Sequence, residues 1–69
     1  MSDTYYTHIV HKGKSEPVTI PYYYSKINGA FYIAFNERVE LLDGTTVTLS
    51  DEQVATIRGR IDDILREKN

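Results

Sequence analysis

The chain of 69 residues contains no cysteine and no long apolar run. Without cysteine there is no disulfide bridge and no thiolate-ligated zinc, so a reducing compartment is the simplest expectation. No stretch approaches the roughly 20 apolar residues that a membrane-spanning helix needs. The first residues, MSDTYYTH, have neither the basic start nor the apolar stretch of a signal peptide. We therefore expect a cytoplasmic protein, and a chain this short predicts one domain spanning residues 1–69.

A strong charge of either sign is also missing, since the net charge is −2. Residues 1–36 carry three lysines against two acidic side chains, a net of +1, and residues 37–69 carry five basic and eight acidic side chains, a net of −3. A protein that binds phosphates is normally basic over at least one face. Nucleic acid is therefore an unexpected partner. The acidic second half favours a basic protein partner, such as a nucleic-acid-handling enzyme.

Residues that could carry catalysis are few. His8 and His11 are three positions apart in a predicted strand, so they point to opposite faces and cannot chelate one ion. Asp62 and Asp63 are adjacent on a predicted helix and diverge by about 100°, so they are not a paired acid and base. The chain also has no glycine-rich phosphate loop and no recognisable nucleophile setting. We expect no enzyme, no cofactor and no metal site.

The dipeptide Asn28-Gly29 is a strong hairpin signal, because both residues tolerate positive φ. A two-residue turn there pairs Ile27 with Ala30 and fixes which side chains share a face. The predicted core face carries Val18, Ile20, Tyr22, Tyr24, Phe31, Ile33 and Phe35. The opposite face carries Thr19, Tyr23, Ser25, Tyr32 and Ala34.

Asp43-Gly44 marks a second hairpin, for which a three-residue loop with Gly44 left-handed keeps polar and apolar residues apart. This register pairs Val39 with Val47. The odd-numbered positions from Phe31 to Leu41 fall on one side without a break, which predicts one long strand from Ala30 to Leu41, bent at residues 36–38. Upstream, residues 4–12 alternate as a strand and KGKSEP turns the chain into the next one. Pro21 lacks an N–H, so we expect it to face a sheet edge or a bulge.

The C-terminal stretch from Ser50 onward has the pattern of an amphipathic helix. Ser50 is a natural N-cap, and Gln53 completes a capping box. Val54, Ile57, Ile61, Ile64 and Leu65 form one apolar stripe, which predicts that the helix lies on the sheet. The expected fold is α+β, with element order ββββα: four antiparallel strands in a bent meander with one C-terminal helix packed on it. The sequence leaves an open sheet and a partial barrel as alternatives.

Six tyrosines are the least expected part of the composition. In the predicted register, Tyr23 and Tyr32 lie on the face opposite the core, together with either Tyr5 or Tyr6 from the first strand. With Lys26 they form the candidate partner-binding residues, because tyrosine is enriched where proteins meet. The alternative is that cross-strand tyrosines only stabilise the sheet. A similar choice applies to Gly59, near Ala55 on the helix, which is either a contact point for another backbone or a tolerated surface glycine.

These observations favour a small non-enzymatic protein-binding module, an inhibitor or accessory protein. In size and style the chain resembles inhibitors from phages and mobile elements, including anti-restriction and anti-CRISPR proteins. One alternative is a single-stranded nucleic-acid-binding domain, with sheet aromatics stacking on bases and lysines touching phosphates. A second alternative is a structural homo-oligomer built through the tyrosine face or the face around Gly59.

Overall fold

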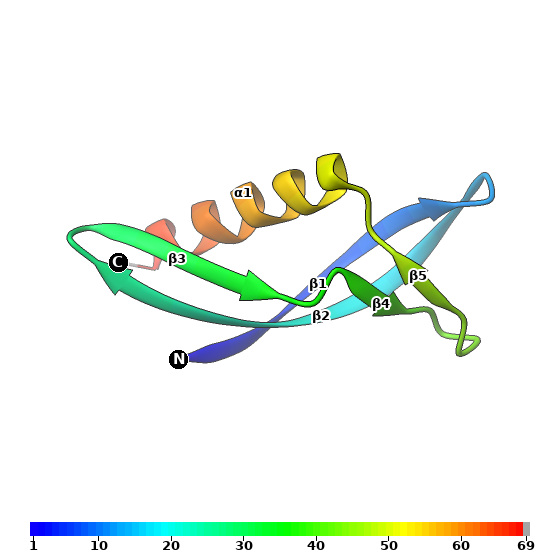
Figure 1. Ribbon diagram of the computed structural model, residues 1–69, viewed down its shortest axis with the longest axis horizontal. Helices are drawn as coiled ribbons and strands as arrows, with labels where there is room; N and C mark the ends of the chain where they lie inside the picture. Colours follow the sequence, from blue (N-terminus) through cyan, green and yellow to red (C-terminus); the bar gives the residue numbers. More distant parts are fainter. Residues whose placement is uncertain (69) are drawn as a thin grey trace.

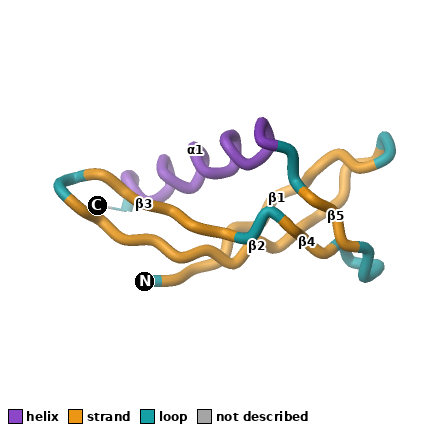
Figure 2. The backbone as a smooth tube through the Cα atoms, in the orientation of Figure 1, coloured by secondary structure: helices purple, strands orange, loops and turns teal. Residues whose placement is uncertain are grey.

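The computed structural model, which describes residues 1–68, contains two antiparallel sheets and one helix (Figure 1). The elements are β1 (Ser2–His11), β2 (Lys14–Ile27), β3 (Ala30–Phe35), β4 (Arg38–Glu40), β5 (Thr46–Thr48) and α1 (Asp51–Glu67). The larger sheet has the order β1-β2-β3, and β4 pairs with β5 in the smaller one. The molecule is elongated, 40 × 19 × 18 Å, with α1 running along one side of the larger sheet (Figure 2).

The α+β class and the C-terminal helix are confirmed, and the four-stranded meander is approximately right. The strands described for residues 1–68 form three- and two-stranded sheets and do not close into a barrel. The predicted strand from Ala30 to Leu41 is in fact two strands, β3 and β4, separated at the predicted corner. There the side chain of Asn36 accepts a hydrogen bond from the backbone N–H of Arg38 at 2.9 Å. This local bond holds a turn, so the chain leaves the first sheet before it pairs again.

The β2–β3 hairpin has the predicted register. Asn28 and Gly29 have φ of 53° and 81°, as a two-residue primed turn requires. Ile27 pairs with Ala30, Tyr24 with Ile33 and Tyr22 with Phe35. The predicted separation of the two faces is therefore correct.

The turn between β1 and β2 is shorter than predicted. Lys12 and Gly13 have φ of 51° and 77°, so these two residues alone reverse the chain, and β2 begins at Lys14 rather than after Pro17.

Pro21 faces an open edge of the sheet, as predicted. Tyr24 and Met1 exchange backbone hydrogen bonds, so the even-numbered residues of β2 bond to β1. Pro21 is odd-numbered, and its nitrogen therefore points away from β1. On that side β3 has already ended at Phe35.

The bulged turn between β4 and β5 is confirmed. Gly44 has φ of 87° and donates its N–H to Leu41 O at 3.0 Å, while Leu41 N–H donates to Thr45 O at 2.8 Å. Val39 pairs with Val47. The side chain of Asp43 accepts a hydrogen bond from the N–H of Thr45 at 2.9 Å, which stabilises the loop.

Helix α1 begins with the predicted capping box. Gln53 N–H donates to the Ser50 hydroxyl at 3.1 Å, and the Gln53 side chain accepts Ser50 N–H at 2.8 Å. From the apolar stripe, Ile57, Ile61 and Leu65 are buried. They meet sheet residues and the smaller β4–β5 unit in one core, whose members are Ile9, Val18, Ile20, Tyr22, Val39, Leu41, Leu49, Ile57, Ile61 and Leu65.

The aromatic rings assigned to the core divide into two groups. Tyr22 is fully inside, with 3% of its surface exposed. Tyr24, Phe31 and Phe35 are half-buried and pack against the core from its margin. Arginine side chains of α1 cover two of these rings, with Arg58 5.4 Å from the centroid of Phe35 and Arg66 5.9 Å from that of Phe31. The guanidinium groups therefore cover rings at the margin of the core that the apolar stripe of α1 does not cover.

Candidate functional site: the outer face of the sheet

One face of the β1-β2-β3 sheet lies opposite α1, and we call it the outer face. Strand pairing defines its members, because residues directly opposite each other share a face. Thr7 of β1 pairs with buried Val18, so the residues between such pairs point outward. The outer face consists of Ser2, Thr4, Tyr6, His8 and Val10 of β1, Ser15, Pro17, Thr19, Pro21, Tyr23, Ser25 and Ile27 of β2, and Ala30, Tyr32 and Ala34 of β3.

Large apolar and aromatic side chains gather on the outer face without cover. Tyr6 is 74% exposed, Tyr23 69% and Tyr32 59%. Val10 and Ile27 belong to the same face and are also exposed. Within the described part of the chain, the other exposed large hydrophobic residues are Met1 and Leu42, which lie at the N-terminus and in the β4–β5 turn. The exposed apolar surface is therefore concentrated on one side of one sheet.

Charge is absent from this same surface. None of the outer-face positions holds aspartate, glutamate, lysine or arginine. The charged residues of the larger sheet, Asp3, Lys14, Glu16 and Lys26, all belong to the helix-facing set. The centres of protein interfaces are depleted of charged residues and enriched in tyrosine. A charge-free sheet face with three exposed tyrosines has this composition.

Tyr23 and Tyr32 form the centre of the site. Tyr23 lies opposite Ala34 and Tyr32 lies opposite Ser25, so the two rings are diagonal neighbours on adjacent strands. Because Ser25 and Ala34 are small, a shallow hollow of about 280 Å³ opens between the tyrosines. A second hollow of about 390 Å³ lies between Tyr23 and Pro21. Both could receive a protruding side chain from another protein.

The structure distinguishes Tyr5 from Tyr6. Tyr5 pairs with buried Ile20 and packs against the core, so it is not available to a partner on the outer face. Tyr6 pairs with Thr19 and points outward. Thr19 is four residues from Tyr23 along β2, about 13 Å at ~3.3 Å per residue. Tyr6 therefore belongs to the same face but stands apart from the central pair.

Lys26 does not join the tyrosines. It pairs with Phe31, on the helix-facing side, and its Nζ lies 5.5 Å from the centroid of the Phe31 ring. The sequence could have predicted this position, because Lys26 is two residues from Tyr24 and therefore shares the face of Tyr24 and not that of Tyr23. Of the five predicted partner-binding residues, the outer face unites Tyr6, Tyr23 and Tyr32, and it excludes Tyr5 and Lys26.

The two histidines of β1 lie on opposite faces of the sheet. His8 belongs to the outer face, whereas His11 belongs to the helix-facing set. Within residues 1–68, no three histidine, cysteine, aspartate or glutamate side chains gather as a metal site requires. In the same range no helix is long and apolar enough to cross a membrane. Gly59 faces open space, since a Cβ added there would meet nothing within 4 Å.

Two features of the site were not identified from the sequence. The first is the absence of charge from the whole outer face, which reading every second residue of the three strands would have revealed. The second is the exposure of Val10 and Ile27 at opposite ends of the face. Their exposure depends on how far α1 extends over the sheet, which the strand pattern alone does not determine.

Comparison of the chain with protein-family models, with curated proteins and with solved structures gives no match.

Proposed function

We propose that this protein is a small non-enzymatic binding module that attaches to another protein through its outer face and acts as an inhibitor or accessory subunit. The observation that carries the proposal is the coincidence of exposed tyrosines and absent charge on one sheet face. A few aromatic anchors usually supply most of the binding energy of an interface. Tyr23 and Tyr32, flanked by two hollows, are suited to be those anchors.

The charged surface suggests which kind of partner approaches. Exposed acidic side chains lie on β4 and just before it, in the β4–β5 turn and along α1; they include Glu37, Glu40, Asp43, Asp51, Glu52, Asp63 and Glu67. Such a surface attracts a basic protein and speeds its association. A nucleic-acid-handling enzyme has a basic substrate site of this kind. Attachment through the outer face, with the acidic part toward that site, would obstruct it.

The proposed role agrees with the size and composition of the chain. A small scaffold with no cysteine suits a cytoplasmic protein. Inhibitors from phages and mobile elements, of the anti-restriction and anti-CRISPR type, have a similar size and style, and we place this chain among such inhibitors as a working hypothesis.

Single-stranded nucleic acid is a less suitable occupant of the same face. Tyr23 and Tyr32 could stack on bases, but binding of nucleic acid draws most of its affinity from contacts between cations and phosphates. The outer face has no lysine or arginine to make them. Of the three lysines that could touch phosphates, Lys12 precedes β2 and Lys14 begins it, both far from Tyr23. The third, Lys26, lies on the helix-facing side over the ring of Phe31.

The test is capture of partners from the native host after nuclease treatment, followed by variants that alter the charge of the face. Ser25→Asp introduces a carboxylate between Tyr23 and Tyr32 and leaves both rings in place. Thr48→Asp introduces the same charge at an exposed position of β5 and is the matched control. We expect capture to be lost in the first variant and retained in the second. Equal capture by both variants, or loss of capture after nuclease treatment of the unmodified protein, would contradict the proposal.

A further inference from the structure

The larger sheet has two edge strands, β1 and β3, and a stretch of β2 beyond the end of β3, and these are protected to different degrees. Along β2, beyond the end of β3, Pro17 and Pro21 remove two of the N–H groups that another strand would need. Along β3, the carbonyl oxygen of Ile33 accepts a hydrogen bond from Arg58 Nε at 3.4 Å. The outer edge of β1 has neither proline nor an arginine bond. Natural sheets rarely leave a long edge strand unprotected, so this edge has the properties of a docking site.

Backbone groups of β1 that point away from β2 can be identified from the register. Met1 and Tyr24 exchange hydrogen bonds, so alternation directs the N–H and C=O of Thr4, Tyr6, His8 and Val10 outward. The N–H of Thr4 is already satisfied by the carboxylate of Asp3 at 2.8 Å. The outward N–H and C=O groups from Tyr6 to Val10 have no backbone or side-chain partner among residues 1–68.

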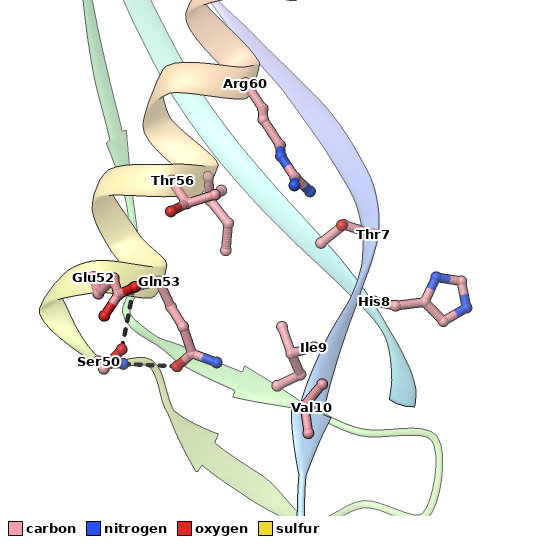
Figure 3. A pocket seen from close by; sticks show the side chains of 10 residues that line it. Thr7, His8, Ile9, Val10, Ser50, Glu52, Gln53, Thr56 and Arg60 are labelled. Atoms are coloured by element: carbon pink, nitrogen blue, oxygen red, sulfur yellow. Dashed lines mark hydrogen bonds between the residues drawn. The ribbon is translucent and has the colours of Figure 1, made fainter. Parts of the chain in front are cut away.

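A groove lies beside this same segment. It has a volume of about 550 Å³ and runs between β1 and the first half of α1 (Figure 3). Gln53, Thr56 and Arg60 of the helix border it on one side, and Ile9 of β1 points toward it from the other. The helix covers the β3 side of the sheet through Arg58 and Arg66, which leaves room for one more strand at the β1 edge.

We infer that the occupant of this edge is β1 of a second copy of the chain, paired antiparallel about a two-fold axis at His8. In this register Tyr6 of one copy lies opposite Val10 of the other, twice, and His8 lies opposite His8. Each of these three residue pairs exchanges two backbone hydrogen bonds. The result is a continuous six-stranded sheet with one helix from each copy on the same side.

Charge at the two ends of β1 selects this occupant. Asp3 lies at one end, where its carboxylate also forms an ion pair with Lys68 of the same copy at 3.5 Å, and Lys12, in the turn to β2, lies at the other. Antiparallel pairing about His8 brings the Lys12-Gly13 turn of each copy alongside Asp3 and Thr4 of its neighbour. The segment Thr4–Val10 between them contains no aspartate, glutamate, lysine or arginine, so two copies meet without repulsion. An isologous interface requires this self-complementarity.

The dimer extends the outer face without covering it. Tyr6 and Val10 of both copies come together at the centre, with one Tyr23–Tyr32 pair on each side. A partner would then meet two copies of the same site. The inference does not depend on that use, because it rests on the β1 edge alone, and assembly of the dimer is measured without any partner.

Sedimentation equilibrium of the purified full chain tests the inference. We expect a species with twice the mass of the chain. His8→Pro removes the central outward N–H, at a position whose cross-strand neighbour Pro17 is already proline, and should raise the dimer dissociation constant at least about tenfold. His8→Ala keeps that N–H and should leave the dimer intact. His8→Lys sets two cations opposite each other across the axis and should also dissociate the dimer. This variant tests the inference even if His8→Pro fails to fold.

A charge exchange gives an independent readout. Lys12→Asp alone should weaken the dimer, because it sets a second carboxylate beside Asp3 of the neighbour and leaves the Asp3–Lys68 ion pair within each copy intact. Adding Asp3→Lys to the same chain should restore the dimer, because the attractive pairs between copies are re-formed in reverse. A single sharp thermal transition shows that each variant is folded, and a variant that has lost the dimer should melt at a lower temperature than the unmodified protein. A chain that stays monomeric at millimolar concentration, or a dimer unaffected by both His8→Pro and His8→Lys, would overturn the inference. A monomer whose β1 edge binds an extended peptide of another protein would likewise overturn it.

Discussion

Arg58 reaches from α1 to the edge of β3, where its Nε lies 3.4 Å from the carbonyl oxygen of Ile33 and its guanidinium lies over the ring of Phe35. One exposed side chain thus joins the helix to the sheet. The i, i+4 spacing of Arg58, Asp62 and Arg66 predicts a ladder of ion pairs, but only Asp62 and Arg66 form one, at 2.7 Å. Arg58 turns to the sheet instead.

The Arg58 contact gives the first prediction. Arg58→Ala should lower the free energy of unfolding by about 0.5–1.5 kcal/mol, through the lost hydrogen bond and the lost contact with Phe35. Arg60 is two residues further along α1, and its side chain has no hydrogen bond or ion pair within residues 1–68, so Arg60→Ala is the matched control and should change little. Chemical denaturation of both variants measures the difference. Equal stability of the two would contradict the structural role of Arg58.

Burial of the helix stripe gives the second prediction. Ile61 has 0% of its surface exposed, at the centre of the core. Ile61→Ala should therefore cost about 2–5 kcal/mol, a large part of the roughly 5–15 kcal/mol that a domain possesses. Ile64 is on the same stripe but only half-buried, so Ile64→Ala should cost clearly less. Thermal melts of the pair check this order, and an unchanged melting temperature for Ile61→Ala would mean that α1 does not dock as described.

The bulged turn gives the third prediction. Gly44 has φ of 87°, where a side chain is strained although a Cβ there would meet nothing within 4 Å. Gly44→Val should cost about 1–2 kcal/mol through backbone strain alone. Asp43→Ala removes only the surface hydrogen bond to Thr45 and should cost less. If denaturation shows the same loss for both variants, the conformation of Gly44 is not what stabilises the turn.

Much of this fold could be predicted because turn residues fix side-chain parity. Asn28-Gly29 fits a two-residue turn, and that one assignment separates Tyr22 and Tyr24 from Tyr23 and Tyr32. The capping box at Ser50 and the stripe through Ile61 likewise depend on local chemistry. Outcomes of this kind need no knowledge of the rest of the molecule.

Features that depend on distant contacts were not predictable in the same way. The KGKSEP segment contains several turn-forming residues, and the sequence does not show that Lys12 and Gly13 suffice. The break after Phe35 depends on Asn36 accepting a hydrogen bond locally rather than β3 continuing into β4. The groove beside β1 exists because α1 contacts the β3 side, and the lateral position of a helix on a sheet is not encoded in its apolar stripe.

Burial of Tyr22 gives the fourth prediction, a loss of stability in alkali. Burial raises the pKa of the Tyr22 phenol, and the nearby charge of Asp3 and then Tyr24 raise it further. Because the folded pKa exceeds the unfolded value, the unfolded chain releases this proton first, and unfolding becomes more favourable as the pH rises above about 10. Tyr22→Phe keeps the ring and removes the titrating group. Denaturation at about pH 8 and about pH 11 should show a greater loss for the unmodified protein than for Tyr22→Phe.

The fifth prediction concerns the outward tyrosines, whose removal should separate binding from stability. Tyr23 and Tyr32 are 69% and 59% exposed, so replacing both by alanine should cost at most about 1 kcal/mol of cross-strand contact for each. Tyr24 is half-buried against Tyr22 and Phe31, with ring centroids 5.9 and 6.3 Å away, so Tyr24→Ala should destabilise more.

Binding should follow the opposite order, because aromatic anchors at the centre of an interface contribute most of its energy. The double variant Tyr23→Ala, Tyr32→Ala should remain folded and fail to capture the partner. Tyr24→Ala, measured well below its lowered melting temperature, should still capture it. Melting temperature and capture are measured on the same preparations, so a folding defect is distinguished from a lost contact. A folded double variant that captures the partner as well as the unmodified protein would mean that these tyrosines only stabilise the sheet and that the binding surface lies elsewhere.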